Sequence, residues 1–282
     1  MSRNSDRLGA QSVQSGAPPP QITQNNDANP FSFVVPTEFV ELPSKGKYYP
    51  EHHPLHNQET IEIKHMTAKE EDILTSRALL KKGVALDRLL DSIIIDKRIK
   101  GENLFVGDRN AILLAARISG YGSDYSTKIT CPSCETNQTC EFDLHTFGVY
   151  EGNGFIENEI TDNGNGTFNV VLPKTKLDVT FKLLSGIDER KLVNHIDKAR
   201  KSKKEEKTVT TQLKQVIIAV NGHPVQKNIE QIVNNLPSLD ASFLRSMVKI
   251  VTPNVDMIQN FECNSCDYEQ ELEVPLTADF FW

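Results

Sequence analysis

The chain has 282 residues, a length that predicts roughly two domains at about 150 residues each and is sufficient to bury a hydrophobic core without disulfide bonds. Its 31 Lys and Arg against 38 Asp and Glu give a formal net charge of −7, which argues against a protein whose main task is to bind nucleic acid or an anionic membrane. The longest apolar run, residues 111–116, is far shorter than the ~20 residues of a membrane span. Composition and charge therefore favour a soluble protein with protein partners.

Residues 1–30 are predicted to form a disordered arm, because they are rich in Pro, Asn and Gln and lack periodic apolar positions. They also lack the apolar stretch of a secretory signal, so the five cysteines are expected to be reduced or bound to metal. An odd number of cysteines, four of them in two Cys-x-x-Cys pairs, fits metal binding better than disulfide pairing.

The first ordered elements are predicted from residue 31 onward. Alternating or β-branched patterns predict strands over residues 31–35, 37–42 and 59–64. The sequence Thr-Ala-Lys-Glu at 67–70 is a capping box and predicts a helix running towards Leu80. Further helices are predicted over residues 86–95 and from an N-cap at Asp108 to Ile118.

The second half of the chain repeats the first. Residues 108–144 align without a gap on residues 240–276, at a constant offset of 132. The nine identical pairs are Asp108/Asp240, Ile118/Ile250, Asp124/Asp256, Cys131/Cys263, Ser133/Ser265, Cys134/Cys266, Gln138/Gln270, Glu141/Glu273 and Leu144/Leu276. Upstream, Lys64-x-x-Thr67-x-x-Glu70 resembles Lys182-x-x-Ser185-x-x-Asp188, and Ile93-Ile94 resembles Ile217-Ile218.

The repeat predicts an α+β fold with two duplicated halves, each made of a β-hairpin, helices and a Cys-x-x-Cys knuckle. The first repeat is expected to span residues 31–150 and the second residues 168–282, joined by a Gly- and Asn-rich linker at 151–167. Chance similarity between two segments in which a knuckle follows a helix is the alternative.

Cys131-Pro-Ser-Cys134 and Cys263-Asn-Ser-Cys266 have the spacing of zinc knuckles, in which a tight turn directs two thiolates at one tetrahedral ion. Since each half supplies one pair, the sequence predicts a single shared Cys₄ zinc ribbon with one structural zinc ion. Closing a loop of about 130 residues costs about 4 kcal/mol of chain entropy. Structural zinc supplies roughly 10–16 kcal/mol in peptides, so the metal is expected to hold the two knuckles together.

A rival metal site would lie within the first repeat and use Cys131, Cys134, Cys140 and His145. The repeat argues against it, because Cys140 aligns with Leu272 and His145 with Thr277, neither of which is a thiolate or imidazole ligand. Cys140 is instead predicted to be a small buried thiol. A redox role of the Cys-x-x-Cys pairs is disfavoured, because neither pair opens a helix after a strand.

No catalytic motif accompanies the knuckles. The chain has no metalloprotease, P-loop, nucleophile-elbow or dinucleotide-binding pattern, and a four-thiolate zinc site has no position for water, so an enzyme is not expected. His52, His53 and His56 are predicted to lie in an exposed loop. The charged insertion at residues 197–208 contains six Lys and Arg without interleaved aromatic residues, so it is predicted to be a solvated surface rather than a nucleic-acid site.

The last three residues, Phe280, Phe281 and Trp282, place large aromatic side chains where a chain normally frays. We expect them to bind a partner protein, because aromatic anchors dominate interface energies. Burial against the core of the same chain is the alternative.

The ordered motifs together resemble the baseplate hub assembly protein family of T-even-type contractile-tailed bacteriophages. The resemblance rests on ELPSKGKYYP at residues 41–50, MTAKEEDIL at 66–74, the two cysteine knuckles and VPLTADFFW at 274–282. It covers nearly the whole chain from Phe39 onward, but neither the N-terminal arm nor the charged insertion.

The resemblance implies a non-enzymatic protein that helps to build the central hub of the tail baseplate through contacts with other hub proteins. It would act in the host cytoplasm during assembly, with the virion tail baseplate as a second expected location. A zinc-ribbon adaptor that binds nucleic acid is the alternative, which steeply salt-sensitive binding to DNA or RNA would reveal.

Overall fold

The computed structural model describes residues 34–155, 158–202, 207–274, 276 and 278–281. The predicted arm at residues 1–30 and Trp282 lie outside the described residues. Residues 37–282 form one compact unit. Within the described ranges, no helix has the length and apolar character needed to cross a membrane.

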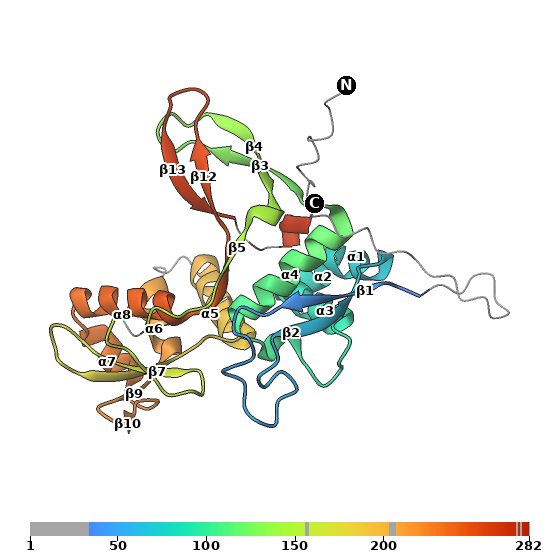
Figure 1. Ribbon diagram of the computed structural model, residues 1–282. Coiled ribbons are helices and arrows are strands. Elements are labelled where there is room, and N and C mark those ends of the chain that lie inside the picture. Colours follow the sequence, from blue (N-terminus) through green and yellow to red (C-terminus); the bar gives the residue numbers. More distant parts are fainter. Residues whose placement is uncertain (1–33, 156–157, 203–206, 275, 277, 282) are drawn as a thin grey trace, which may run out of the picture. The chain divides into compact units, whose positions relative to one another are not determined.

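The first half begins with an antiparallel hairpin followed by helices (Figure 1). The hairpin pairs β1 (Thr37–Glu41) with β2 (Thr60–Lys64), and the helices are α1 (Ala68–Thr75), α2 (Arg77–Lys82), α3 (Ala85–Ile93) and α4 (Val106–Tyr121), with a 3₁₀ turn at Gly101–Asn103. Val40, Ile61 and Ile63 alternate with exposed or half-buried strand residues and point into a core shared with the helices. The period-2 pattern therefore produces a half-buried sheet, as the sequence predicts.

Two predicted helix boundaries are wrong. The capping box at Thr67 is confirmed, but the helix that it starts ends at Thr75, because Ser76 adopts an extended conformation and a separate helix begins at Arg77. The helix α4 begins at Val106, with Phe105 as its N-cap, so Asp108 is not an N-cap. The predicted strand at residues 31–35 is absent over its described part, Val34 and Val35.

Asp108 has a different task from capping. Its buried carboxylate accepts hydrogen bonds from the Ser44 backbone N–H (3.0 Å), the Ser44 hydroxyl (2.6 Å) and the Tyr49 hydroxyl (2.8 Å). These donors lie in the connection between β1 and β2, so Asp108 ties this loop to α4. Burial raises the pKa of Asp108, although the three hydrogen bonds oppose this effect.

The second half is built around an antiparallel sheet in the order β10-β9-β8-β7-β6. The strands are β6 (Thr161–Asp162), β7 (Thr167–Val171), β8 (Asp178–Lys182), β9 (Ile217–Val220) and β10 (His223–Pro224). The helices are α5 (Gly186–Lys201), α6 (Thr208–Val216), α7 (Ile229–Asn235) and α8 (Ser238–Val251). Its core contains Phe168, Phe181 and Leu244, together with the buried Ile160.

Two further hairpins follow the last long helix of each half and lie together in Figure 1. The first pairs β3 (Asp124–Thr130) with β4 (Asn137–Asp143), and the second pairs β12 (Ile258–Glu262) with β13 (Glu269–Glu273). In the chain, β5 (Gly148–Tyr150) follows the first of these hairpins and β11 (Asn254–Asp256) precedes the second, and these two strands pair with each other. Short 3₁₀ turns lie at Leu144–Thr146 and Ala278–Phe281.

The two halves contain several corresponding interactions. In each, a lysine at the end of the second strand pairs at 2.7 Å with the acidic residue of a capping box, and the hydroxyl of the N-cap bonds to the same carboxylate. The sets are Lys64, Glu70 and Thr67 in the first half and Lys182, Asp188 and Ser185 in the second. The buried Asp240 accepts from the Lys174 and Thr175 amides between β7 and β8, as Asp108 does from its own hairpin loop.

Candidate metal centre

Each Cys-x-x-Cys sequence forms a tight turn at the tip of its hairpin, and the two turns have the same geometry. The first cysteine of each pair donates its N–H across the turn and accepts an N–H from the residue after the second cysteine, which has a left-handed backbone. The bonds are Cys131 to Thr136 O (2.9 Å) and Glu135 to Cys131 O (2.9 Å) in the first turn, and Cys263 to Tyr268 O (2.9 Å) and Asp267 to Cys263 O (3.1 Å) in the second.

Backbone amides also point at the sulfurs. The N–H groups of Ser133 and Ser265 each donate to the Sγ of the preceding knuckle cysteine at 3.4 Å, in Cys131 and Cys263 respectively. Hydrogen bonds to sulfur favour the charged thiolate, which is the form that binds a metal ion. Each turn therefore directs a backbone N–H at the sulfur of its first cysteine.

The structure brings all four predicted cysteine ligands together. Their sulfur atoms lie within 4.8 Å of one another, and the contacts cross between the halves: Cys131 to Cys266 at 3.7 Å and Cys134 to Cys263 at 3.6 Å. A tetrahedral ion with metal–sulfur bonds of about 2.3 Å has sulfur–sulfur edges of about 3.8 Å. Because a disulfide requires about 2.05 Å, the cysteines are free thiols whose spacing fits a metal ion instead.

The cluster is half buried and electrostatically uneven. Cys131 and Cys263 are fully buried, whereas Cys134 and Cys266 are exposed. Hydrogen bonds with Thr136 lower the pKa of Cys134 to about 6, while hydrogen bonding to Cys134 raises the pKa of Cys266 to about 12. One thiolate therefore disfavours a second one beside it, and a cation at the centre of the cluster removes that conflict.

Comparison with known proteins identifies the family. The family described as T4 bacteriophage base plate protein matches residues 35–282, which include both knuckles. The chain belongs to this family. No curated protein and no solved structure matches the chain.

Cys140 and His145 of this baseplate protein are outside the cluster of close potential ligands, which among the described residues contains only the four knuckle cysteines. Cys140 is half buried and packs with Ile129 and Leu272 around the ribbon core of Cys131, Cys263 and Phe261. Its sulfur lies 3.6 Å from the Gln138 amide nitrogen. It is therefore less buried than predicted, but packs beside Leu272, the residue with which it aligns.

Gln138 connects the two hairpins of the baseplate protein beside the cysteines. Its Nε2 donates to Glu262 O at 2.7 Å, and its Oε1 accepts from the Asn264 N–H at 2.9 Å. Sequence reasoning did not assign a role to this residue. The signal in the sequence was its identity with Gln270 in the repeat. That identity does not tell whether the residue bridges the two hairpins or faces solvent.

The aromatic end of the baseplate protein packs into its own core. Phe280 and Phe281 are 0% and 1% exposed, with ring centroids 5.0 Å from Tyr125 and 6.4 Å from Tyr121 respectively. Arg117 Nε donates to Phe280 O at 3.1 Å. Burial within the same chain, the alternative considered for the sequence, is thus observed for these two residues. A partner contact by this end stays a prediction.

The histidine cluster lies in the connection between β1 and β2. His52 is exposed, and His53 stacks on Tyr49 with ring centroids 4.6 Å apart. His56 Nδ1 forms a hydrogen bond with Tyr49 O at 2.6 Å. Two of the three rings thus contact Tyr49, and in the described part of the chain they belong to no metal-ligand cluster.

Proposed function

We propose that this baseplate protein is a non-enzymatic component that helps to build the central hub of the tail baseplate, through contacts with other hub proteins. The observation that carries the proposal is the cluster of four cysteines, assembled from two distant knuckles in a chain of the baseplate family. The protein would act in the host cytoplasm during assembly and remain in the virion tail.

The proposed metal is one zinc ion per chain, bound by Cys131, Cys134, Cys263 and Cys266. Four thiolates in a tetrahedron suit zinc, and the two-plus-two arrangement differs from iron–sulfur cysteine spacings. With all four positions taken by sulfur, the ion would have none left to activate water. The zinc would therefore cross-link the halves rather than catalyse a reaction.

We also propose that the halves are two copies of one unit, related by an approximate two-fold rotation. Support comes from the shared offset of 132 in the hydrogen bonds of both knuckles and from the buried Asp108 and Asp240. In addition, Ile94 bridges to Ile63 of β2, and Ile217 pairs with Phe181 of β8, so one residue of each isoleucine pair returns to the second strand of a hairpin.

Charge supports protein partners over nucleic acid for the ribbon. Residues 250–282 contain seven Asp and Glu and no Lys, Arg or His. On the second hairpin, Glu262, Glu269, Glu271 and Glu273 are all exposed. A surface of this charge repels phosphate, whereas a zinc ribbon that binds nucleic acid needs Lys or Arg side chains to displace the counterions of the phosphates.

Metal analysis of the purified full-length protein tests the zinc site. We expect one zinc per chain, loss of that zinc in Cys131→Ser and Cys263→Ser, and retention in the control Cys140→Ser. Two metal ions per chain, or full zinc retention in Cys263→Ser, would exclude the shared site. Mass spectrometry of purified virions and assembly of baseplates with the same variants test the hub role, which fails if baseplates form normally without the protein.

A further inference from the structure

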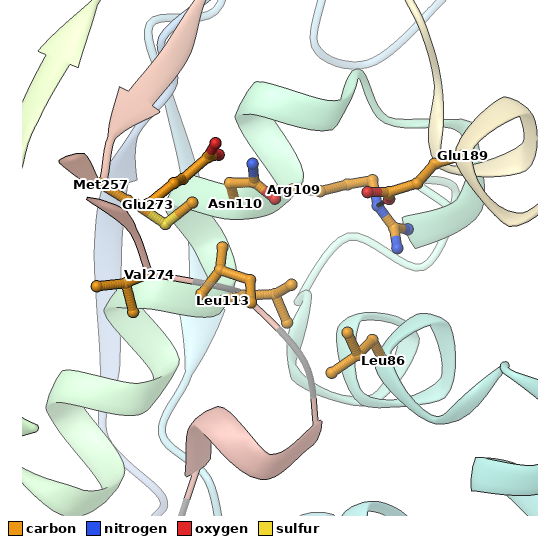
Figure 2. Close-up of a pocket in the computed structure, with 9 residues that line it drawn as sticks. Leu86, Arg109, Asn110, Leu113, Glu189, Met257, Glu273 and Val274 are labelled. Carbon is orange, nitrogen blue, oxygen red and sulfur yellow. Dashed lines mark ion pairs between the residues drawn. The ribbon is translucent and has the colours of Figure 1, made fainter. Parts of the chain in front are cut away.

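A pocket of about 130 Å³ lies beside α4 (Figure 2), and no cysteine lines it. Its apolar walls come from α3, α4 and the segments flanking the second hairpin: Leu86, Leu113, Met257, Val274 and Leu276. Its polar lining consists of Arg109, Asn110, Glu189 and Glu273. Figure 2 shows Glu273 and Asn110 on one side of the view and Glu189 with Arg109 on the other.

The positive charge of Arg109 is already neutralised by groups that do not line the pocket. Arg109 Nη1 donates to Asp87 Oδ1 and to Gly101 O, both at 2.7 Å. Asp87 Oδ2 accepts from Arg190 at 2.7 Å, and Arg190 also pairs with Glu102 at 2.8 Å. Arg109 and Arg190 are thus balanced by the carboxylates of Asp87 and Glu102, neither of which lines the pocket.

The two pocket carboxylates remain as excess negative charge. Glu189 forms a long ion pair of 3.9 Å with Arg109 Nε but no hydrogen bond with it, and Glu273 has no ion pair within the described part of the chain. Burial raises the pKa of Glu189, and Arg109 opposes this effect. Asn110 donates its Nδ2 to Asn254 at 3.0 Å, which leaves its Oδ1 as an acceptor.

The pocket therefore combines apolar walls with three acceptor groups and an excess charge of about −2. We propose that it binds a lysine or arginine side chain of a partner protein. The aliphatic stem would pack on Leu113, Met257 and Val274, and the cationic head would pair with Glu273, with Glu189 adding to the negative charge of the pocket. Long basic side chains have this division between an apolar stem and a charged head. The proposal does not rest on the zinc site or on the hub role.

Methyl NMR of the full-length protein tests this directly. With ¹³C-methyl-labelled methionine, Met257 reports on the pocket, while the buried Met247 belongs to the other core and serves as an internal control. The probe is n-butylguanidinium, a mimic of the arginine side chain, and n-butanol is its neutral counterpart. At constant ionic strength, we expect the Met257 methyl signal to shift saturably with the guanidinium and only weakly with the alcohol.

Two substitutions sharpen the test. Glu273→Gln should weaken guanidinium binding about fivefold, the effect of one partly exposed ion pair. Glu141→Gln is the matched control, because Glu141 holds the corresponding position on the first hairpin and does not line the pocket. Equal shifts with butanol, unchanged affinity in Glu273→Gln, or displacement of the guanidinium by Mg²⁺ would each overturn the proposal.

Discussion

Replacing Phe280 with Ala measures how much the aromatic end contributes to the fold. The side chain is 0% exposed, and its ring lies 5.0 Å from that of Tyr125 and 5.9 Å from that of Phe281. Truncating a buried Phe to Ala typically costs about 3–5 kcal/mol, through lost transfer energy and the cavity left behind. Since a protein typically unfolds at about 5–15 kcal/mol, this variant should lose a substantial share of its stability.

The assay is urea unfolding followed by circular dichroism, with zinc content measured on the same samples. Phe39→Ala is the matched control, because Phe39 is 71% exposed and its removal should change the free energy of unfolding by less than about 0.5 kcal/mol. We expect Phe280→Ala to keep its zinc but unfold at much lower urea. If both variants were equally stable and only Phe280→Ala failed to assemble, the energetic role in the core would be refuted and the partner contact supported.

Glu70→Gln should flatten the dependence of stability on pH. Burial alone would raise the pKa of Glu70, but hydrogen bonds from Lys64, Ser92 and Thr67 outweigh it and lower the pKa to about 2. The carboxylate therefore stabilises the fold above about pH 4.5, by up to about 3 kcal/mol, and this contribution is lost as pH falls towards 2; urea unfolding between pH 7 and 3 should show it, with Glu71→Gln, an exposed position on the same helix, as control. Asp87→Asn should lower the free energy of unfolding by about 3–5 kcal/mol, because it leaves Arg109 and Arg190 without their shared carboxylate, and an unchanged urea midpoint would contradict this. DNA should not bind with submicromolar, steeply salt-dependent affinity in a fluorescence anisotropy titration; such binding would revive the nucleic-acid adaptor and direct attention to residues 198–207.

Features that depend on local spacing were accessible from the sequence. The alternation in residues 60–64 specifies β2, the capping box specifies the start of α1, and the Cys-x-x-Cys turns need only four residues each. The convergence of the knuckles was also predicted, because an incomplete pair of thiolates in each half requires a second pair.

Features that depend on distant partners were not accessible. Asp108 looks like an N-cap by residue type, but it satisfies donors 59 and 64 residues away, which no local pattern reveals. The pairing of Asp87 with Arg109 and Arg190 likewise joins elements up to 103 residues apart. Phe281 could have faced a partner or the core with the same hydrophobicity, so only the packing of the chain decides between them.

The four-cysteine cluster cannot be completed until the second knuckle has been synthesised. Cys131 contacts Cys266 and Cys134 contacts Cys263, so each knuckle contacts a sulfur of the other knuckle. The second knuckle leaves the ribosome 132 residues after the first. At about 5–20 residues per second, that interval lasts roughly 7–26 s. During this time the first pair has two thiols and no partner. A disulfide between Cys131 and Cys134 at this stage would remove both sulfurs from the shared cluster, so the four-sulfur cluster forms only if the first pair stays unoxidised until the second arrives.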